Sequence, residues 1–339
     1  MEIDISVIIP AFNAKDTIRS TLESIIKQDF EKTRFEVIVI DDGSTDDTAD
    51  LSEAFLAKSG LSYKVVTQPN SGVSVARNTG MKHASGKYLY FIDADDLVSP
   101  ECFEKMFSRA ASTDSEVVYC GFDEISPDGN LIAPYKSKYS YHAGTLKGDV
   151  VLQYVLKSEI WIWTGSGLFR RDFLVKNSLM YTEGCSFCED TEFRMKALFL
   201  ARRVSCVPES LVYYVQHPSS TVHSVNLKRF HCIGSMRRLR RFFERQGATE
   251  ALLKEVRTYR LPAQYVSMAD YLLVNNYSHD MIEHFISSNE FKKITKSARM
   301  GFSKKKLVLK MRIIGLTHFR GKYVKFLKLR YVKSQGHNR

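Results

Sequence analysis

Two carboxylates in this sequence stand at a spacing that suits the binding of a metal ion. Asp93 and Asp95 are separated by one residue in the segment DADD, which directly follows an apolar run at 88–92. Two such oxygen ligands at the end of a strand can hold Mg²⁺ or Mn²⁺, and the ion then also binds substrate phosphates. The pair alone is a weak signal, because Asp95 or Asp96 could instead cap the helix that follows Pro100.

Four strand–helix pairs in the first hundred residues would bring other polar side chains to the same place. Apolar runs typical of buried strands alternate with stretches of helical spacing: strands at 5–9, 35–40, 63–67 and 88–92, and helices at 16–28, 44–58, 73–83 and 100–110. This alternation predicts a parallel sheet that is buried on both faces. Right-handed crossovers place the carboxyl ends of the strands on one edge, where open α/β sheets bind ligands. The polar loops after the strands are therefore expected to converge: 10–13, 41–46, 68–72 and 93–96.

The rest of the chain divides into an irregular α/β part and a helical part. Strands near 117–122, 165–169, 204–207 and 211–215, with helices at 147–157 and 189–201, are expected to extend the same sheet. From about residue 226 the pattern is helical, with candidates at 230–246, 250–275 and 280–287. The sequence thus predicts an α/β domain with a mostly parallel, Rossmann-like sheet, followed by a helical C-terminal extension.

Composition and charge distribution exclude several classes of protein. The chain has 339 residues, of which 44% are hydrophobic and 26% charged, as in ordinary globular proteins. No apolar run approaches the roughly 20 residues of a membrane span, and the acidic N-terminus does not resemble a signal peptide, so we expect a cytoplasmic protein. Residues 291–339 hold 16 Lys and Arg and no Asp or Glu, whereas the remainder is net acidic. A basic segment of this kind favours docking to phosphate groups of lipid or nucleic acid.

Four sequence blocks together resemble the signature of the family 2 glycosyltransferases with the GT-A fold. They are ISVIIPAFNAKDTI, EVIVIDDGSTDDT, NSGVSVARNTG and GKYLYFIDADD, and they occur in the family's order and spacing. The resemblance covers roughly residues 3–222. It implies a GT-A domain at 1–225, with a nucleotide-sugar half at 1–100 and an acceptor half at 101–225, followed by a helical region at 226–339.

The resemblance also implies a nucleotide-sugar site at the predicted sheet edge. Asp41 would accept a hydrogen bond from the base, and the base would be lined by Pro10, Ala11 and Phe12. The complete set of implied donor-binding residues is Pro10, Ala11, Phe12, Asp41, Asn70, Arg77, Asp93 and Ala94. Asp95 would bind Mn²⁺ or Mg²⁺, with His217 as a further candidate ligand. An apolar floor with a few oriented polar groups suits a nucleotide, and a cation would carry the charge of its diphosphate. Arg77 has the alternative of being a surface helix charge.

The second half would then supply the acceptor site and a base. Glu189 and Asp190 resemble the family's acidic pair at the start of a helix, and Asp190 is our candidate for the general base that removes the acceptor's proton. The two carboxylates could instead merely complement the helix dipole. Trp161 and Trp163 lie where the family builds its acceptor pocket, although core packing explains them equally well.

The predicted reaction is therefore transfer of a single sugar with inversion. The donor is a nucleotide-sugar, with UDP favoured by the resemblance and thymidine or guanosine nucleotides as alternatives. The acceptor is a hydroxyl of a growing glycan, such as a lipid-linked oligosaccharide or an intermediate of capsule, exopolysaccharide or lipopolysaccharide. The QxxRW signature and membrane helices of processive relatives are missing from this sequence.

The basic segment 291–339 has an expected role in this picture. Leu307, Met311 and Ile314 recur at helical spacing after three lysines, and Tyr323, Phe326 and Leu327 also stand among lysines. Such segments lie on anionic membrane surfaces, which would place the protein on the inner face of the cell membrane. A solvated tail is the simpler alternative. Two other functions compete with the transferase: a nucleotidyltransferase, which lacks its Gly-rich loop here, and a nucleic-acid binder, which we do not expect because it leaves the converging loops unexplained.

Overall fold

The computed structural model describes residues 2–217, 225–298 and 304–336, and only the backbone of 330–336. The chain divides into two compact units, Met1–Ser224 and Val225–Arg339, which are called here the N-terminal and C-terminal units. Among the described helices, none is long and apolar enough to cross a membrane.

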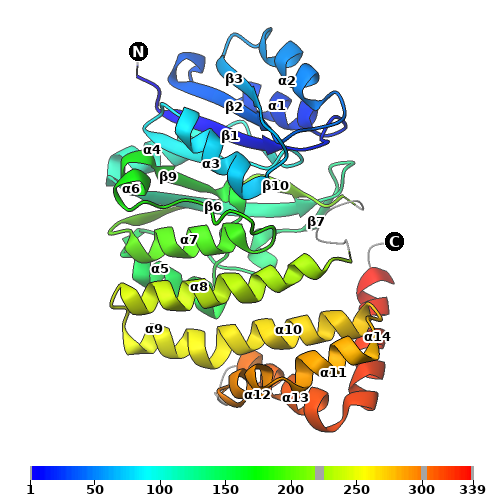
Figure 1. Ribbon diagram of the computed structural model, residues 1–339. Coiled ribbons are helices and arrows are strands. Elements are labelled where there is room, and N and C mark those ends of the chain that lie inside the picture. The colour runs from blue at the N-terminus through cyan, green and yellow to red at the C-terminus, as the bar shows by residue number, and fades with distance from the viewer. Residues whose placement is uncertain (1, 218–224, 299–303, 337–339) are drawn as a thin grey trace. The chain divides into compact units, whose positions relative to one another are not determined.

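The N-terminal unit begins with the predicted alternation of strands and helices. Its first elements are β1 (Ile5–Ala11), α1 (Ile18–Ile26), β2 (Phe35–Asp41), α2 (Thr48–Leu56), β3 (Ser62–Thr67), α3 (Val73–His83), β4 (Tyr88–Phe91), β5 (Leu97–Val98) and α4 (Cys102–Thr113). Strands β1, β2 and β4 are completely buried, as their apolar sequences predict, whereas β3 is an edge strand with exposed positions. Figure 1 shows helices covering the sheet from both sides.

The second half of this unit completes one ten-stranded sheet. Its elements are β6 (Val117–Ile125), β7 (Leu131–Ala133), β8 (Thr145–Leu146), α5 (Gly148–Lys157), β9 (Gly167–Arg170), α6 (Arg171–Lys176), α7 (Glu189–Leu200) and β10 (Val204–Val215). The strand order is β3-β2-β1-β4-β9-β6-β10-β5, with β7 and β8 beside β6 and β10. The two strands predicted at 204–207 and 211–215 are one strand, β10, whose pairing with β6 shifts register near Ser210.

Close packing brings the site-bearing helix α3 onto the sheet. Gly80 of α3 lies so close to β1 that a Cβ atom there would be 2.3 Å from Cγ2 of Ile8. Only glycine allows this approach without rearrangement. Because α3 is fixed in this way, Arg77, one turn earlier on the helix, is directed toward the carboxyl ends of the strands.

The C-terminal unit is helical, as predicted. It contains α8 (His231–Arg245), α9 (Glu250–Glu255), α10 (Leu261–Val274), α11 (His279–Ser287), α12 (Asn289–Lys296), α13 (Lys304–His318) and α14 (Arg320–Gly336). The single helix predicted at 250–275 is interrupted by a π-helical segment, Val256–Arg260, just before Pro262 in the first turn of α10.

The basic C-terminal segment packs within its own unit. Leu309, Ile313 and Leu316 of α13 are buried. Tyr323 of α14, which the sequence placed among membrane-facing residues, is only 8% exposed, and its hydroxyl donates to the Asp270 carboxylate at 3.0 Å. Arg312 donates to the same carboxylate at 2.6 Å. The described part of the segment is therefore packed into the C-terminal unit and is not a solvated tail, and Tyr323 faces inward.

Candidate active site

Asn13 joins the loops that follow β1 and β2. Its side-chain Oδ1 accepts from the backbone N–H of Thr45 at 2.8 Å, and its own N–H donates to Oγ of Ser44 at 2.9 Å. Asn13 has a φ of +48°, a left-handed conformation that asparagine tolerates better than most residues. These two hydrogen bonds hold the turn after Pro10 against the loop between β2 and α2.

Asp42 joins the loop after β2 to the loop after β3. Its two carboxylate oxygens accept from the backbone N–H groups of Ser71 at 3.0 Å and Gly72 at 2.8 Å. Beside it, Gly43 has a φ of +75°, and a Cβ atom there would lie 2.7 Å from the backbone nitrogen of Asn70. Glycine is therefore required at 43, and Asn70 is held exposed next to the end of β2. Three of the four predicted loops thus contact one another through named hydrogen bonds.

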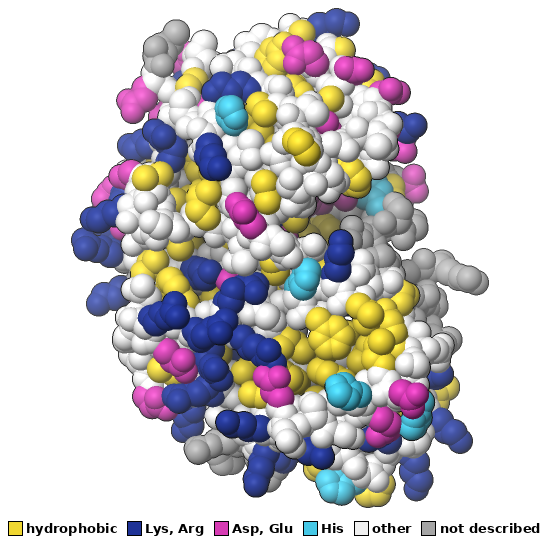
Figure 2. Space-filling view, in the orientation of Figure 1, with side chains coloured by type: hydrophobic (Ala, Val, Ile, Leu, Met, Phe, Trp, Pro, Cys, Tyr) yellow, Lys and Arg dark blue, Asp and Glu magenta, His cyan; other side chains and the backbone are white. Residues whose placement is uncertain are grey.

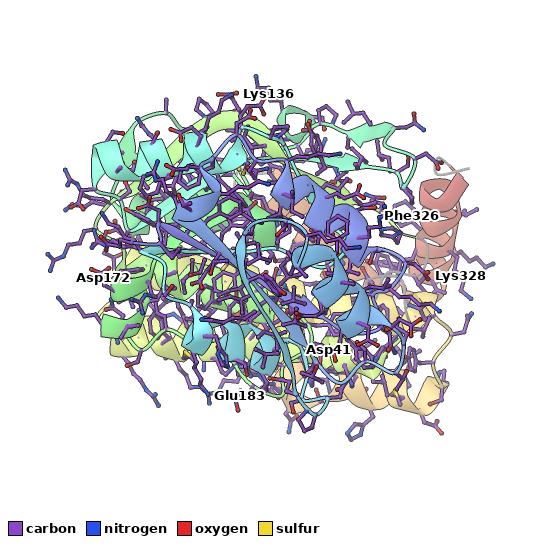
Figure 3. All side chains as sticks on the ribbon, turned by 90° about the horizontal axis from the view of Figure 1, so that it is seen from above. Asp41, Lys136, Asp172, Glu183, Phe326 and Lys328 are labelled. Atoms are coloured by element: carbon purple, nitrogen blue, oxygen red, sulfur yellow. The ribbon has the colours of Figure 1, made fainter. Side chains whose placement is uncertain are left out.

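The residues predicted to line the nucleotide base lie at different depths in these loops. Pro10 and Ala11 end β1 and are buried, and Ala11 pairs with Asp41 in the sheet. Phe12 is 51% exposed, so its ring is available to a ligand. Asp41, labelled in Figure 3, is only 2% exposed, and its Oδ1 accepts from the N–H of Ser44 at 3.3 Å. The roles of these residues in binding a base stay predictions.

Arg77 connects both halves of the site. Its side chain is 3% exposed, and its two terminal nitrogens donate to Asp93 at 2.7 Å and to Glu189 at 2.9 Å. The guanidinium also lies over the ring of Tyr181, 5.0 Å from its centroid. Burial alone would lower the pKa of Arg77, but the charge of Asp93 and the groups around it outweigh burial and raise it. Arg77 is thus no surface helix charge, and it stays a cation beside both acidic pairs.

The loop after β4 carries the predicted metal ligand Asp95, and the other candidate, His217, follows β10. Burial, and after it the charge of Asp93, raises the pKa of Asp95 to about 6, while His217 acts in the opposite direction. His217 therefore lies near enough to Asp95 for their charges to interact. Ala94 between the two carboxylates is buried. The weaker histidine candidate, His223, lies outside the described residues.

This arrangement fits a divalent ion that is bound partly by the protein and partly by a substrate. A cation would offset both causes of the raised pKa of Asp95, the burial of its charge and, after it, the repulsion from Asp93. In the described part of the chain, no three His, Cys, Asp or Glu side chains are grouped so as to hold an ion alone. An ion here would therefore take its other ligands from phosphate and water, as Mg²⁺ commonly does.

Asp96 has a structural role that differs from the predicted one. The helix-capping interpretation of Asp95 and Asp96 is wrong, because α4 begins at Cys102 and has no side-chain cap. Asp96 is instead buried, and its carboxylate accepts from Nε1 of Trp163 at 2.8 Å and from the N–H of Val215 at 3.1 Å. Trp163 is thereby fixed beside the carboxylates of the loop.

The acidic pair at the start of α7 is held by a second arginine. Asp190 accepts from Nη1 of Arg194 at 2.8 Å, an i,i+4 pair on the helix. Arg194 in turn lies over the ring of Trp161, with Cζ 5.9 Å from a ring centroid. Trp161 and Trp163 are both partly exposed. Trp163 donates to Asp96, and Trp161 lies under Arg194, the partner of Asp190. The structure thus brings both predicted acceptor tryptophans to the site's periphery.

Glu189 and Asp190 differ in their electrostatic surroundings. Burial, and next the charge of Asp190, raises the pKa of Glu189, although Arg77 opposes this. Burial would also raise the pKa of Asp190, but the charges of Arg194 and Arg77 outweigh it and hold that pKa below its usual value. Neighbouring carboxyl groups whose pKa values are pushed apart mark a division of acid–base roles. The lowered pKa keeps Asp190 ionised near neutral pH.

Sequence reasoning did not identify three residues that organise the site: Asp42, Asp96 and Arg194. Arg194 had a usable signal, because it follows Asp190 by four positions in a predicted helix. Asp42 and Asp96 belong to acidic clusters, and nothing in the sequence tells which member of a cluster binds backbone N–H groups.

Comparison with known proteins supports this picture at the level of family and fold. The sequence profile described as Glycosyl transferase family 2 matches residues 6–179. An Escherichia coli protein named uncharacterized glycosyltransferase YibD is 34% identical over 220 residues, which are 64% of this chain and 62% of that protein. TarS of Staphylococcus aureus, a poly(ribitol-phosphate) β-N-acetylglucosaminyltransferase, is 30% identical over 210 residues, 62% of this chain and 35% of TarS. The match thus spans less than two thirds of these relatives.

Solved structures share the fold along nearly the whole chain. The crystal structure of S. aureus TarS 1–349 with UDP-GlcNAc superposes with a TM-score of 0.73 at 21% identity, covering 98% of this chain and 92% of that one. A mannosyltransferase from Pyrobaculum calidifontis, solved with GDP-Man and Mn²⁺, has a TM-score of 0.54 at 15% identity, with 93% and 87% covered. The predicted GT-A fold is confirmed.

Proposed function

Because the chain belongs to glycosyl transferase family 2, we propose that it transfers one sugar from a nucleotide-sugar to a hydroxyl of a glycan acceptor. UDP is the favoured nucleotide, since the structurally similar TarS was solved with UDP-GlcNAc. The family assignment replaces the nucleotidyltransferase and the nucleic-acid binder that the sequence left as alternatives. A surface polysaccharide or teichoic-acid-like polymer is the proposed acceptor class, because TarS acts on poly(ribitol-phosphate).

The observation that carries this proposal is the pairing of both acidic groups with one buried arginine. Asp93 comes from the end of β4 and Glu189 from the start of α7, and both contact Arg77. Asp95 follows Asp93 by two positions and Asp190 directly follows Glu189, so the candidate metal ligand and the candidate base belong to the two acidic segments that this arginine joins. A site of this kind can bind a charged diphosphate on one side and activate a hydroxyl on the other.

In the proposed reaction, Asp190 accepts the proton of the acceptor hydroxyl as its oxygen attacks the anomeric carbon. A single in-line displacement of this kind inverts the configuration. Arg194 keeps the Asp190 carboxylate ionised and oriented, and Arg77 adds positive charge beside the donor residues. Asp95, with Asp93 and His217 nearby, would hold Mn²⁺ or Mg²⁺, which supplies charge stabilisation to the departing nucleoside diphosphate.

We further propose that the C-terminal unit docks on an anionic membrane surface. Leu307, Met311 and Phe326 are 51%, 63% and 57% exposed on α13 and α14, among exposed lysines. Figure 3 labels Phe326 and Lys328 on α14. Each basic residue near anionic lipid contributes about 1 kcal/mol, so a few engaged lysines give reversible binding. Exposed apolar side chains beside them would insert at the interface.

The transferase proposal is tested by incubating the full chain with a panel of UDP-, GDP- and dTDP-sugars. Release of free nucleotide, followed with and without Mn²⁺, should select one donor and increase with the metal. Addition of candidate polyol-phosphate and oligosaccharide acceptors should accelerate the release. If no nucleotide-sugar is bound or hydrolysed under any of these conditions, the proposed reaction is wrong.

A further inference from the structure

A cavity of about 460 Å³ opens within the C-terminal unit, far along the sequence from the residues of the proposed reaction. It lies between α8, α10 and the α11–α12 junction. Its lining includes the aromatic side chains of Phe230, Tyr265 and Phe285, the charged side chains of Arg237 and Glu290, and Gly234. Its volume falls in the range of small-molecule sites, which are usually mostly apolar with a few placed polar groups.

Aromatic rings form one side of this cavity. Phe230 meets Phe285 edge-on, with ring centroids 5.2 Å apart, and Phe285 stacks parallel to Tyr265 at 6.0 Å. Phe230 and Phe285 are partly exposed, and Met281 is 38% exposed. Figure 2 shows the corresponding apolar patch between the start of α8 and α11, bordered by a band of basic side chains. These rings give a ligand flat apolar surfaces to lie against.

A charged pair forms the polar side of the cavity. Nη2 of Arg237 donates to the Tyr265 hydroxyl and to Oε1 of Glu290. Ser288 fixes this geometry, because it ends α11 and its Oγ accepts from the N–H of Phe291 at 3.1 Å, which starts α12 and places Glu290 in its first turn. Arg237 and Glu290 remain 38% and 55% exposed, so both can still reach a ligand. The pair offers hydrogen-bond donors and acceptors side by side.

The position of Gly234 leaves the cavity open. A Cβ atom at Gly234 would meet only the flexible end of Arg238, at 3.2 Å, within 4 Å. Glycine is less favourable than alanine inside a helix, so α8 carries an unfavourable residue at the cavity wall. A larger side chain here would occupy the space without disturbing the backbone.

We propose that this cavity is a saccharide-binding site that retains one or two sugar units of the acceptor glycan. A sugar ring has apolar C–H faces for the aromatic side and hydroxyl groups that donate to Glu290 and accept from Arg237. The headgroup of a phospholipid fits less well, because Glu290 would repel its phosphate. The choice of a glycan rests on the proposed function, whereas the cavity itself does not. A second site of this kind would hold the acceptor glycan while one sugar is added to it.

The test is an NMR titration of the full chain with free sugars. The panel is glucose, galactose, mannose, N-acetylglucosamine, N-acetylgalactosamine and their common disaccharides, with glycerol as a negative control. At least one sugar should bind with a dissociation constant in the millimolar range. Gly234→Leu, which fills the cavity and favours the helix, should weaken that binding at least about tenfold. Glu290→Gln should weaken it as well, and Glu250→Gln, an exposed glutamate paired with Arg257 in the same unit, should not.

Two results would overturn the assignment. One is that no sugar of the panel binds, or that binding is the same in Gly234→Leu as in the parent. The other is that dodecyl phosphate binds in the cavity and Gly234→Leu abolishes that binding while sugars do not compete, which would make it a lipid site. UDP binding is measured in the same samples. If the parent chain does not bind UDP, that result would count against the transferase proposal and not against the saccharide site.

Discussion

Arg77 and Glu189 are 112 positions apart in the chain, and their side chains form a buried ion pair at 2.9 Å. Arg77 belongs to α3, in the proposed donor half, and Glu189 begins α7, in the proposed acceptor half. The same guanidinium also binds Asp93. One side chain therefore links two parts of the N-terminal unit that the proposed reaction would have to combine.

Replacing Arg77 by Met should destabilise the protein strongly. The change leaves Glu189 and Asp93 without their cation, and breaking a buried ion pair by removing one partner typically costs about 3–5 kcal/mol. Urea unfolding of the N-terminal unit measures this loss. The double variant Arg77→Met with Glu189→Gln should recover part of it, because the uncompensated buried charge is then gone. Equal stability of single and double variants would show that the pair is not coupled.

Asp95→Asn should stabilise the metal-free protein while abolishing metal-dependent donor binding. The folded-state pKa of Asp95, about 6, lies above its unfolded value, so the folded state binds more protons between about pH 4 and 6 and loses stability as pH rises through that window. The variant lacks this loss. Its melting temperature should exceed that of the parent at pH 8, and the difference should shrink as pH falls below 6. Calorimetry of UDP with Mn²⁺ gives the second readout, and unchanged metal dependence would contradict the assignment.

Metal binding itself should weaken as pH falls through about 6 in the parent chain. Protons and the cation compete for the Asp95 carboxylate, whose pKa is raised to about 6. Mn²⁺ titrations at pH 8, 7, 6 and 5 should show a constant affinity at first and a progressive loss below pH 6. An affinity that stays constant down to pH 5 would place the metal elsewhere.

Asp190→Asn should reduce turnover by about 10²- to 10⁴-fold and leave donor affinity within a few fold, as expected for a positioned base. The matched control is Asp172→Asn, an aspartate on α6 with a 77% exposed side chain. Steady-state kinetics with the selected donor separates the two effects. A loss confined to donor affinity would place Asp190 in the nucleotide site.

Arg194→Met tests whether Arg194 controls the ionisation of Asp190 or only packs against its neighbours. Burial raises the pKa of Asp190, and Arg194 and Arg77 together hold it below its usual value. Removal of Arg194 leaves Arg77 to oppose burial with less help, so the pKa of Asp190 should rise. The acid limb of the pH–rate profile should therefore move to higher pH. In Arg194→Lys, which keeps the positive charge, the acid limb should lie closer to its position in the parent protein. Lower activity with an unchanged acid limb would limit Arg194 to packing against Trp161.

The sequence predicted the parts of this site that lie on strand ends, because a parallel sheet forces those ends together. The loops after β1, β2, β3 and β4 follow from apolar periodicity alone. The role of each carboxylate within an acidic cluster could not be predicted from that periodicity. Asp96, for example, is buried and accepts a hydrogen bond from Trp163, whereas Asp95 is only partly buried, and that difference depends on Trp163 approaching from 67 positions away.

The basic C-terminal segment shows a second limit of prediction from sequence. Its apolar residues recur at helical spacing, which cannot distinguish a face that meets a membrane from one that meets another helix. The structure separates them: Leu309, Ile313 and Leu316 are buried, whereas Leu307, Met311 and Ile314 are exposed. Tyr323 turned inward because Asp270 of α10 provides a partner for its hydroxyl. Removal of the whole segment would therefore expose the core of the C-terminal unit and could not test membrane binding.

Point substitutions on the exposed face test membrane binding without this disturbance. The double variant Met311→Ser with Phe326→Ser removes two exposed apolar side chains and leaves Asp270, Arg312 and Tyr323 in place. The parent chain should sediment with phosphatidylglycerol vesicles and not with phosphatidylcholine vesicles. Its binding should weaken with added salt, because exposed charges are screened over about 8 Å at physiological ionic strength.

The double variant should bind these vesicles more weakly at every salt concentration, since apolar insertion adds to the electrostatic attraction. Leu131→Ser, on β7 of the N-terminal unit, is the control, because Leu131 is 59% exposed and lies outside the basic segment. Unchanged binding in the double variant, with salt dependence intact, would mean that the lysines act alone. Equal sedimentation of the parent chain with both lipids would remove the membrane proposal and leave the transferase proposal as it stands.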